Sequence, residues 1–150
     1  MANIIGTNGN DTLIGSDSAD TINGKAGNDN ITATNGNDTL TGGGGNDTFV
    51  YNLDYYGTDI ITDFGGIGKG VNPSAAVIAE VDTLDFQSPG LTARNLLFTQ
   101  NGNNLEITFE GVDDFQTGFA SPKVILQNFA LENLDNLSLS TGATVDLGNI

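Results

Sequence analysis

The stretch GTNGNDTLI, residues 6–14, holds one aspartate, two asparagines, two glycines and a short apolar end, and its pattern returns every nine residues. Four further blocks follow in the same frame: GSDSADTIN, GKAGNDNIT, ATNGNDTLT and GGGGNDTFV, ending at residue 50. The sixth position is always aspartate, at Asp11, Asp20, Asp29, Asp38 and Asp47. The eighth position is always large and apolar, at Leu13, Ile22, Ile31, Leu40 and Phe49. Five repeats in one frame predict a repetitive architecture.

A period of nine favours a solenoid over a meander of hairpins. In a meander, the Asn-Gly and Gly-Asn pairs would form the turns. Six turn residues would then leave only three per strand, below the usual length of about 5–6. In a solenoid each short strand pairs with the equivalent strand one coil away, about 4.8 Å along the axis. With two repeats per coil, odd and even repeats form two parallel sheets, with eighth positions inside and seventh and ninth positions facing solvent.

This stacking places like charges together. Asp11 and Asp29 would face each other, as would Asp29 and Asp47, and Asp20 and Asp38. Two carboxylates about 5 Å apart repel by roughly 0.8 kcal/mol in water and about 3 kcal/mol at an effective dielectric near 20. A divalent cation between each pair would reverse this effect. Calcium fits best, because it takes 6–8 oxygens in irregular geometry, whereas magnesium demands a tight octahedron.

Glycines dominate the first and fourth positions, where we expect them to turn carbonyls toward the ion without a clashing Cβ. Ser18 and Ala19 replace the usual Gly-Asn pair in the second repeat. That loop is therefore expected to be the stiffest fit and to form the weakest site. Asp17, at a third position, is expected to be a solvated turn residue.

Composition narrows the classes of function. The net charge is −15, from 19 acidic and 4 basic residues, which argues against nucleic acid or an anionic membrane surface as a partner. Cysteine and histidine are absent, which excludes disulfides, zinc fingers and histidine-dependent triads. No nucleophile–base pair is visible, and we expect no enzymatic activity. Neither a signal peptide nor a membrane-spanning run is recognisable, so we expect any export to use another route.

The remainder of the chain predicts further β structure. LLFTQ (96–100), NGNN (101–104) and LEITFEG (105–111) form an alternating hairpin pattern, KVILQNF (123–129) a strand, and ALENLDNL (130–137) a short helical turn. We expect residues 1–64 to form the repeat roll and residues 65–150 its continuation and C-terminal cap, in one continuous domain. One motif and one group of side chains outside the repeats carry no function in this interpretation. GGIGKG (65–70) lacks the ending of a phosphate-binding loop, and the acidic side chains expected to be surface charge are Glu80, Glu106, Glu110, Asp113 and Asp114.

The repeats resemble the RTX, or haemolysin-type, nonapeptide, glycine-glycine-x-glycine-x-aspartate-x-apolar-x. The resemblance is most specific over residues 6–50 and continues through TFVYN, GTDIITDF (57–64) and VDTLDF (81–86). NGNNLEITFEG and VILQNF are similar to the β region that often closes such proteins. The resemblance implies an all-β fold: a right-handed parallel β-roll of two short-stranded sheets, loaded with calcium and closed by a C-terminal β region with a hairpin. It also implies bacterial type I secretion.

The resemblance further implies which atoms bind each ion. One turn would give its aspartate and the carbonyls of its second and fourth positions, and the turn two repeats later its aspartate and first and third carbonyls. The first site would use Thr7, Gly9, Asp11, Gly24, Ala26 and Asp29. The second would use Ser16, Ser18, Asp20, Ala33, Asn35 and Asp38. The third would use Lys25, Gly27, Asp29, Gly42, Gly44 and Asp47.

Two further sites lie beyond the five repeats. GTDII resembles a degenerate sixth turn, so Asp59 would pair with Asp38 and the carbonyls of Thr34 and Gly36. Asp63 would complete a fifth site with Gly43, Gly45 and Asp47. The insert at 65–80 departs from the usual spacing and leaves Asp82 and Asp85 unassigned. Three calcium ions are expected within the repeats, and these sites would make four or five.

We therefore expect a secreted calcium-binding module that is disordered or loosely collapsed where calcium is scarce and folded where calcium is millimolar. Its partners would be calcium and, through export, the type I secretion machinery. One alternative is a surface-layer or adhesive role, in which the outward Thr/Asn rows or residues 91–150 bind a cell surface, a glycan or ice. Another is that the chain is the C-terminal export module of a larger secreted protease, lipase or toxin.

Overall fold

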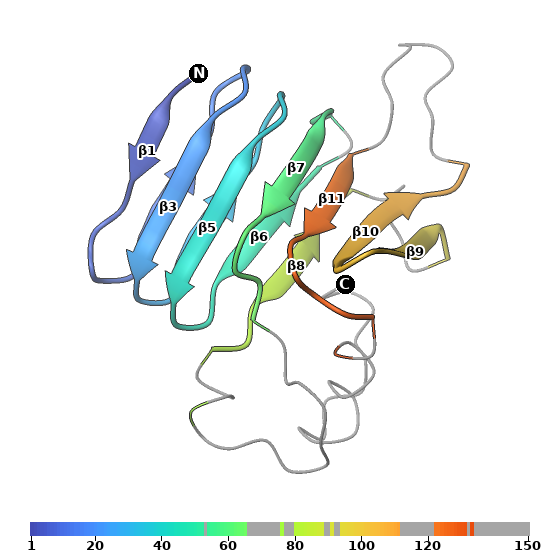
Figure 1. Ribbon diagram of the computed structural model, residues 1–150. Coiled ribbons are helices and arrows are strands. Elements are labelled where there is room, and N and C mark those ends of the chain that lie inside the picture. Colours follow the sequence, from blue (N-terminus) through green and yellow to red (C-terminus); the bar gives the residue numbers. More distant parts are fainter. Residues whose placement is uncertain are drawn as a thin grey trace.

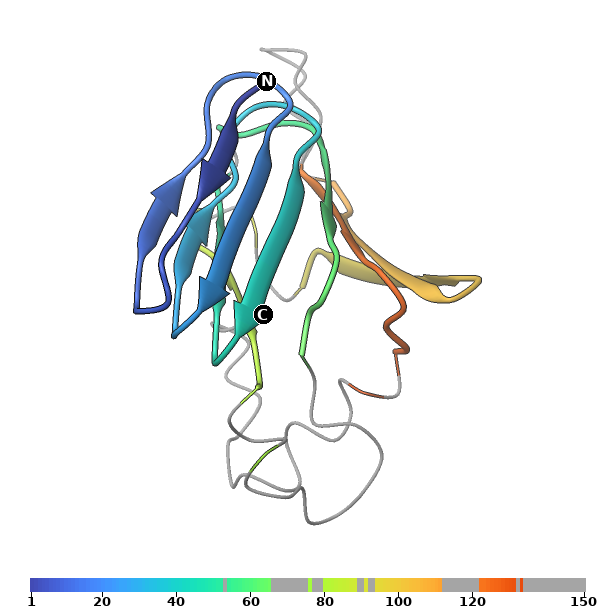
Figure 2. The same cartoon turned by 60° about the vertical axis from the view of Figure 1, so that its left-hand side comes forward.

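The computed structural model describes residues 1–52, 54–65, 76, 80–88, 91, 94–111, 122–131 and 133. In this part of the chain, the fold is two facing parallel sheets joined by turns, with an antiparallel hairpin at one end (Figures 1 and 2). The larger sheet contains, in spatial order, β1 (Asn3–Ile5), β3 (Thr21–Ala26), β5 (Thr39–Gly44), β7 (Thr58–Ile61), β11 (Lys123–Leu126), β10 (Asn104–Phe109) and β9 (Leu96–Asn101). The smaller sheet contains β2 (Thr12–Ile14), β4 (Asn30–Thr32), β6 (Thr48–Tyr51) and β8 (Thr83–Phe86). The predicted all-β roll is confirmed.

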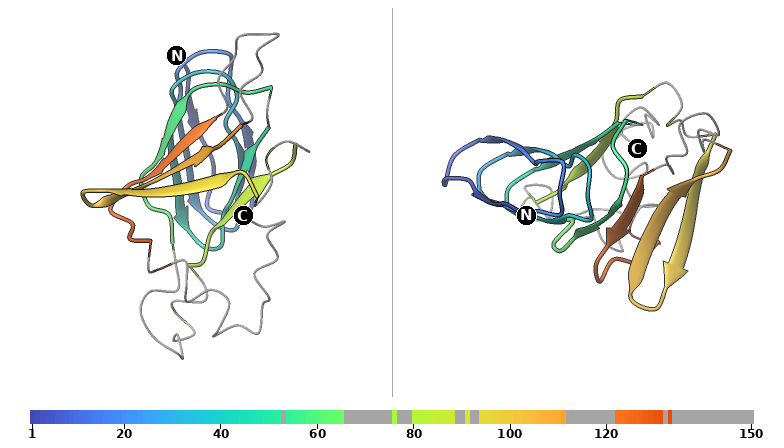
Figure 3. Two further views of the ribbon diagram at one scale, coloured as in Figure 1. Left: turned by 90° about the vertical axis from the view of Figure 1, so that its right-hand side faces the viewer. Right: turned by 90° about the horizontal axis from the view of Figure 1, so that it is seen from above.

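Each coil of the roll consists of two repeats, as predicted. β2 pairs with β4 and β4 with β6 in parallel, so that Leu13, Ile31 and Phe49 align. β3 pairs with β5 in the facing sheet, where Ile22 aligns with Leu40. The blue-to-teal coils lie one behind another when seen from above, while β9 and β10 project away from them (Figure 3).

The eighth-position side chains form the core of the roll. Ile22, Ile31, Leu40 and Phe49 are fully buried. Ile61 and Leu84 continue this row, and the side chains that extend it into the C-terminal strands are Leu105, Ile107, Val124 and Leu126. Burying one such side chain stabilises a fold by about 1.5–3 kcal/mol. The thin core is therefore a real but limited source of stability for a chain with so many turn residues.

The irregular spacings after residue 50 do not change the register of the strands. β5 pairs with β7 at an offset of 21 residues, with Leu40 opposite Ile61. β6 pairs with β8 at an offset of 35 residues, with Phe49 opposite Leu84. The strands stay in step in both cases, so the turn aspartates that precede them also stay aligned.

The C-terminal strands extend the larger sheet. The predicted hairpin is confirmed, with Asn101 opposite Asn104 and Gly102 at a φ of +60° in the tight turn. The predicted strand of residues 123–129 is present as β11, which lies parallel to β7 and antiparallel to β10. Both sheets thus contain strands from either side of residue 64, although the division expected there stays a prediction.

Several predictions concern residues that the structure does not describe. These are most of GGIGKG, most of the helical turn at 130–137, and Asp113 and Asp114. Within the described residues, no helix is long and apolar enough to cross a membrane.

Candidate metal centre

The turn aspartates form two ladders that run along the roll. In the ladder before the smaller sheet, the backbone N–H of Asp11 donates to Oδ1 of Asp29 at 2.8 Å, and that of Asp29 to Oδ1 of Asp47 at 2.8 Å. In the ladder before the larger sheet, Asp20 donates to Asp38 at 2.8 Å. The structure therefore brings together all three aspartate pairs expected from the repeats.

Both ladders continue beyond the fifth repeat. Asp38 donates through its N–H to Oδ1 of Asp59 at 2.9 Å, so the degenerate sixth turn takes its expected place. Asp47 donates in the same way to Oδ1 of Asp82, also at 2.9 Å. The unassigned Asp82 thus occupies the step after Asp47. The sequence indicates this place for Asp82 only weakly. The segment VDTLDF resembles the Asp-Thr-apolar end of each repeat, but it follows a long insert.

Asp63 takes a different place from Asp82. Its carboxylate accepts the N–H groups of Gly42 at 3.0 Å and Gly43 at 2.8 Å. Asp63 is exposed and lies on the backbone of the fifth turn, outside the ladder that contains Asp47. The ladder partner of Asp47 is therefore Asp82, and not Asp63 as the predicted fifth site requires.

Glycine is required where a turn stacks on the coil before it. At the fourth position, Gly27, Gly36 and Gly45 have φ values of +114°, +127° and +124°. A Cβ on Gly36 would lie 2.7 Å from backbone atoms of Ser18 and Ala19. Ser18 itself has no positive φ, and neither has Gly9. The turn that contains Ser18 belongs to the first coil and stacks on no earlier turn. A side chain at this fourth position therefore meets no backbone, and serine can replace glycine.

First-position glycines leave room for the carboxylates. A Cβ built on Gly24 would collide with Oδ2 of Asp29, and a Cβ on Gly42 would collide with Oδ2 of Asp47. The second carboxylate oxygen therefore lies close to the first residue of its own turn, while the first accepts an N–H of the neighbouring coil.

Three carboxylate oxygens in the middle of the ladders are buried without a hydrogen-bond partner. They are Oδ2 of Asp29, Asp38 and Asp47, in residues that are only 1–2% exposed. A buried, unsatisfied polar group costs about 1–3 kcal/mol, and more when it is charged. A calcium ion would satisfy such oxygens, because hard carboxylate and carbonyl oxygens are its preferred ligands. The residues present therefore fit the ion.

Four of the ladder carboxylates hold protons more tightly than ordinary aspartates, because burial raises their pKa values. Burial raises the pKa of Asp59 to about 7, and the Asp38 charge adds to this effect. Burial likewise raises the pKa of Asp82 to about 7, with a contribution from Asp47. The pKa values of Asp38 and Asp47 are also raised by burial. Without a cation, the ladder lowers its repulsion by binding protons.

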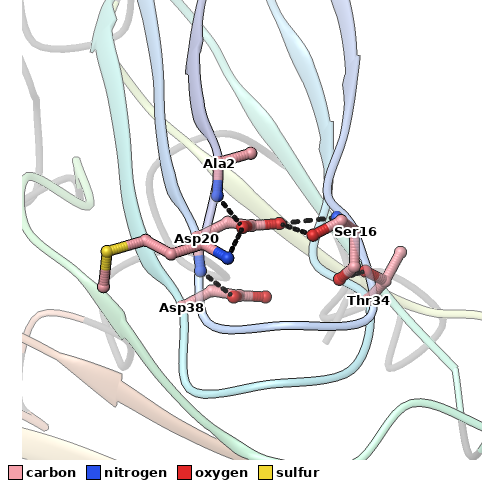
Figure 4. A network of polar contacts seen from close by, with 6 residues as sticks. Ala2, Ser16, Asp20, Thr34 and Asp38 are labelled. Carbon is pink, nitrogen blue, oxygen red and sulfur yellow. Dashed lines mark hydrogen bonds and ion pairs between the residues drawn. The ribbon is translucent and has the colours of Figure 1, made fainter.

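The first coil satisfies its carboxylates with the protein's own donors (Figure 4). Oδ2 of Asp20 accepts the N–H of Ser16 at 2.6 Å and its hydroxyl at 2.7 Å, while Oδ1 accepts the N–H of Ala2. These bonds, first that of Ala2 and then those of Ser16, lower the pKa of Asp20. In the first repeat, Oδ2 of Asp11 likewise accepts two hydrogen bonds from one residue, the N–H of Thr7 at 2.5 Å and its hydroxyl at 2.9 Å.

Some of the predicted carbonyl ligands already accept hydrogen bonds. The Ser16 carbonyl accepts the hydroxyl of Thr34, which lies beside it in Figure 4. The carbonyl of Gly44 accepts the N–H of Gly27 at 2.8 Å. A carbonyl has a second lone pair, so such contacts leave room for an ion. The remaining predicted carbonyls lie in the same turns: those of Thr7, Gly9, Ser18, Gly24, Lys25, Ala26, Gly27, Ala33, Thr34, Asn35, Gly36, Gly42, Gly43 and Gly45.

The described part of the chain contains no group of three or more acidic side chains already arranged as a metal site. The ladders offer carboxylates in pairs, with backbone oxygens beside them. Such an arrangement suits an ion that would be bound by carboxylates from two neighbouring coils.

An asparagine ladder, which the sequence interpretation missed, runs beside the aspartates. The N–H of Asn28 donates to Oδ1 of Asn10 at 2.9 Å, and that of Asn46 to Oδ1 of Asn28 at 3.1 Å. Thr58 donates similarly to Asn37 at 2.9 Å. These bonds run from the later coil to the earlier one, opposite to the aspartate bonds. The signal in the sequence is the recurrence of Asn at the fifth position of four of the five repeats.

Comparisons with known proteins agree with the repeats. Residues 3–31 and 23–54 match the family of the RTX calcium-binding nonapeptide repeat (4 copies). A comparison with curated proteins gives no match.

Solved structures give more distant likenesses. The AlgE6R2 subunit of the Azotobacter vinelandii mannuronan C5-epimerase is 24% identical, with a TM-score of 0.49 over 87% of this chain and 89% of that one. The extracellular lipase LipA of Serratia marcescens is 22% identical, with a TM-score of 0.42 over 87% of this chain and 19% of the lipase. The AlgE6R3 subunit of the same epimerase is 20% identical, with a TM-score of 0.31 over 97% of this chain and 88% of that one.

Proposed function

Because residues 3–54 are RTX calcium-binding nonapeptide repeats, we propose that this chain is a module that folds on binding extracellular calcium. The observation that carries the proposal is the set of three buried, unpartnered oxygens on Asp29, Asp38 and Asp47. Bound calcium supplies positive charge and an oxygen-seeking coordination sphere. The chain's residues hold the carboxylates in line, exclude water from them and present backbone oxygens around them.

Linkage connects ion binding to folding. Ions that bind only the folded ladder add RT ln(1 + [Ca]/Kd) per site to the free energy of unfolding. Extracellular calcium modules commonly have Kd values of about 10⁻⁴–10⁻³ M. At a free concentration tenfold above Kd, each site adds roughly 1.4 kcal/mol. Three to five sites would add about 4–7 kcal/mol, comparable to the net stability of a whole domain.

Export fits this dependence. Inside a cell, where free calcium is far below such Kd values, the ladder repulsion would keep the chain loose. Outside, calcium would bind and the roll would form. We propose type I secretion as the route and an extracellular or cell-surface location, and the support for both is the RTX character of residues 3–54.

The chain is proposed to have no catalytic activity of its own. Its buried acids are used in stacking, and the repeats supply backbone and carboxylate oxygens rather than a nucleophile with a base. A role as the export and folding module of a larger secreted enzyme or toxin is compatible with this proposal, because the same folding switch would serve a neighbouring domain.

The outward rows give less support to an ice-binding or adhesive role. In the smaller sheet, one aligned row contains Thr12, Asn30, Thr48 and Thr83. The next row contains Ile14, Thr32, Val50 and Asp85, and Val50 is buried, contrary to the expectation that every ninth position faces solvent. A charged and two aliphatic side chains in this row interrupt a regular threonine face.

The proposal is tested by far-UV circular dichroism of chelator-treated protein during a calcium titration, with magnesium as the control ion. A cooperative coil-to-β transition with calcium alone, between sub-millimolar and millimolar concentration, is expected. Full β structure in the chelated protein that calcium leaves unchanged would contradict the proposal.

A further inference from the structure

Two strand edges lie open at the end of the roll that carries the first repeat. β1 is the outermost strand of the larger sheet and β2 that of the smaller sheet, at the end opposite the hairpin of β9 and β10 (Figure 1). In the part of the chain that the structure describes, β1 pairs only with β3, and β2 only with β4. Each therefore presents one edge to a further strand.

The register of both strands shows which backbone groups point outward. In β1, the carbonyl of Ala2 accepts an N–H of β3. Alternate residues of a parallel strand bond to the same neighbour, so Asn3 and Ile5 direct their N–H and C=O groups away from β3. By the same alternation, Thr12 and Ile14 of β2 direct theirs away from β4.

The two open edges lack the usual protection against pairing. Soluble proteins commonly place lysine, proline or a bulge on such an edge, whereas β1 and β2 contain neither lysine nor proline. Ile5 and Ile14 are instead 57% and 59% exposed. The inward Ile4 and Leu13 are half-buried, while the side chains at the same position in β3 and β4 are fully buried. This end of the roll therefore leaves apolar surface uncovered, as a terminal repeat without a polar cap does.

A second copy of the chain fits both edges at once. One coil rises by about 4.8 Å over two repeats, so β2 lies roughly half that spacing behind β1 along the roll. A two-fold axis parallel to the strands compensates for this offset, because it places the partner's β2 beside β1 and the partner's β1 beside β2, both antiparallel and at one spacing. Asn3 then faces the partner's Ile14, and Ile5 faces the partner's Thr12, in pairs that exchange both backbone hydrogen bonds.

The same arrangement covers the apolar end and keeps the acids apart. Ile4 packs against the partner's Leu13 inside the roll. The two copies of Asp11 lie in opposite sheets, at least about 10 Å apart, where salt screens most of their repulsion. In the larger sheet the row of aspartates stops before β1, since Ala2 holds that position.

Other occupants match this end less well. At the far end of the roll, the larger sheet continues beyond β7 with three more strands, whereas the smaller sheet ends at β8. A copy stacked head to tail would therefore meet only one sheet. A single peptide strand from another protein would likewise satisfy one edge. Head-to-head pairing satisfies both edges and closes into a dimer.

We propose that β1 and β2 form the interface of a head-to-head dimer of this chain. The inference goes beyond the proposed function, but the first coil must be folded, so the dimer forms in calcium. Strands of three residues cover a small area. The dimer therefore belongs to the weak associations that bury less than about 1,200 Å² and depends on protein concentration.

Proline substitutions test the backbone pairing. Ile5→Pro/Ile14→Pro removes two outward N–H groups and no hydrogen bond to β3 or β4, and edge strands accept proline. The matched control, Ile5→Thr/Ile14→Thr, removes the same side chains but keeps the N–H groups. In sedimentation equilibrium in millimolar calcium, we expect a concentration-dependent dimer for the wild type and the threonine variant, and a monomer for the proline variant.

A cysteine experiment tests the register and does not depend on how the proline variant folds. The chain has no cysteine, and hydrogen-bonded antiparallel pairs have Cα atoms about 5.5 Å apart, a distance that suits a disulfide. Under mild oxidation in calcium, an equimolar mixture of Asn3→Cys and Ile14→Cys chains should form disulfide-linked heterodimers. Either variant alone should not, because each cysteine faces an unsubstituted residue of its partner.

Three results would overturn the inference: a wild type that stays monomeric at every concentration, a proline variant that dimerises like the wild type, or a threonine variant that loses the dimer as fully as the proline variant. Heterodimers that form no faster than the homodimers of either cysteine variant would also overturn it. Circular dichroism of the same samples separates this inference from the proposed function. A monomer that folds on adding calcium contradicts the dimer alone, and a chain that calcium does not fold contradicts the proposed function.

Discussion

The backbone N–H of Asp47 donates to the carboxylate of Asp82, 35 residues further along the chain, at 2.9 Å. Within the repeats, the same bond joins Asp29 to Asp47 across 18 residues. The insert before Asp82 therefore leaves the ladder unbroken. A row of acids held this way destabilises the folded state without a cation and stabilises it when a cation is bound.

Replacing Asp29 by Asn should have opposite effects with and without calcium. The amide keeps an acceptor for the N–H of Asp11 but removes one charge from the middle of the ladder. Without calcium, we expect Asp29→Asn to raise the free energy of unfolding, because repulsion falls. With calcium, we expect a loss of roughly 1.4–3 kcal/mol, because Asp29 belongs to two successive pairs.

Far-UV circular dichroism in chelator, which reports the fraction of β structure, measures the first effect, and urea unfolding in millimolar calcium measures the second. Asp17→Asn is the control, since Asp17 is exposed and bonds only outside the ladder, to Asn35. The same sign of change for Asp29→Asn under both conditions would contradict the ladder as the calcium site.

The calcium-free protein should become less stable as the pH rises from about 4 to 7. Asp59 and Asp82 have folded-state pKa values of about 7, against an ordinary value of 3.8. In this window the folded state binds more protons than the unfolded state, so each group removes up to about 1.4 kcal/mol per pH unit. Below pH 4 both states are protonated, and above pH 7 the loss is complete.

Far-UV circular dichroism in chelator at pH 5.0 and 7.5 checks this sign, with a larger fraction of β structure expected at pH 5.0. Calcium should remove the difference at pH 7.5 by taking the place of the protons. A chelated protein that is more stable at pH 7.5 would show that these carboxylates are not held in a desolvated ladder.

Lys25→Gly should stabilise the roll. Lys25 has a φ of +82°, a conformation that favours glycine, and Gly43 has a φ of +104° at the same position one coil on. Relief of the backbone strain is worth about 1 kcal/mol or more, partly offset by the greater freedom of glycine in the unfolded chain. An unfolding midpoint below that of the wild type, measured in calcium, would contradict this interpretation of the turn.

Gly36→Ala should destabilise the roll, and Gly9→Ala should not, although both glycines hold the fourth position of a repeat. Gly36 has a φ of +127°, and a Cβ there would lie 2.7 Å from the backbone of the preceding coil. The expected cost is about 1–3 kcal/mol or more. Gly9 lacks a positive φ, and the nearest atom to its Cβ would be Oγ1 of Thr7 at 3.9 Å. Equal effects of the two variants on the urea midpoint would contradict the stacking of turns.

The sequence was informative wherever the nine-residue frame is intact. The frame predicts the inward row of Ile22, Ile31, Leu40 and Phe49 and the pairing of alternate aspartates, because both follow from coil length alone. It could not place Asp82, since strand pairing across the long insert decides that step. It also could not show that Ser16 and Thr34 use their hydroxyls within the turns, because those bonds depend on how two coils meet.

The central claim is that calcium bound along the ladder supplies most of the stability of the roll. Equilibrium urea unfolding at a series of buffered free calcium concentrations tests it most directly. The free energy of unfolding should rise steeply with the logarithm of free calcium, with a slope that corresponds to at least three ions taken up on folding. A free energy that stays constant from chelator to millimolar calcium would contradict the claim and would leave the apolar core as the main support.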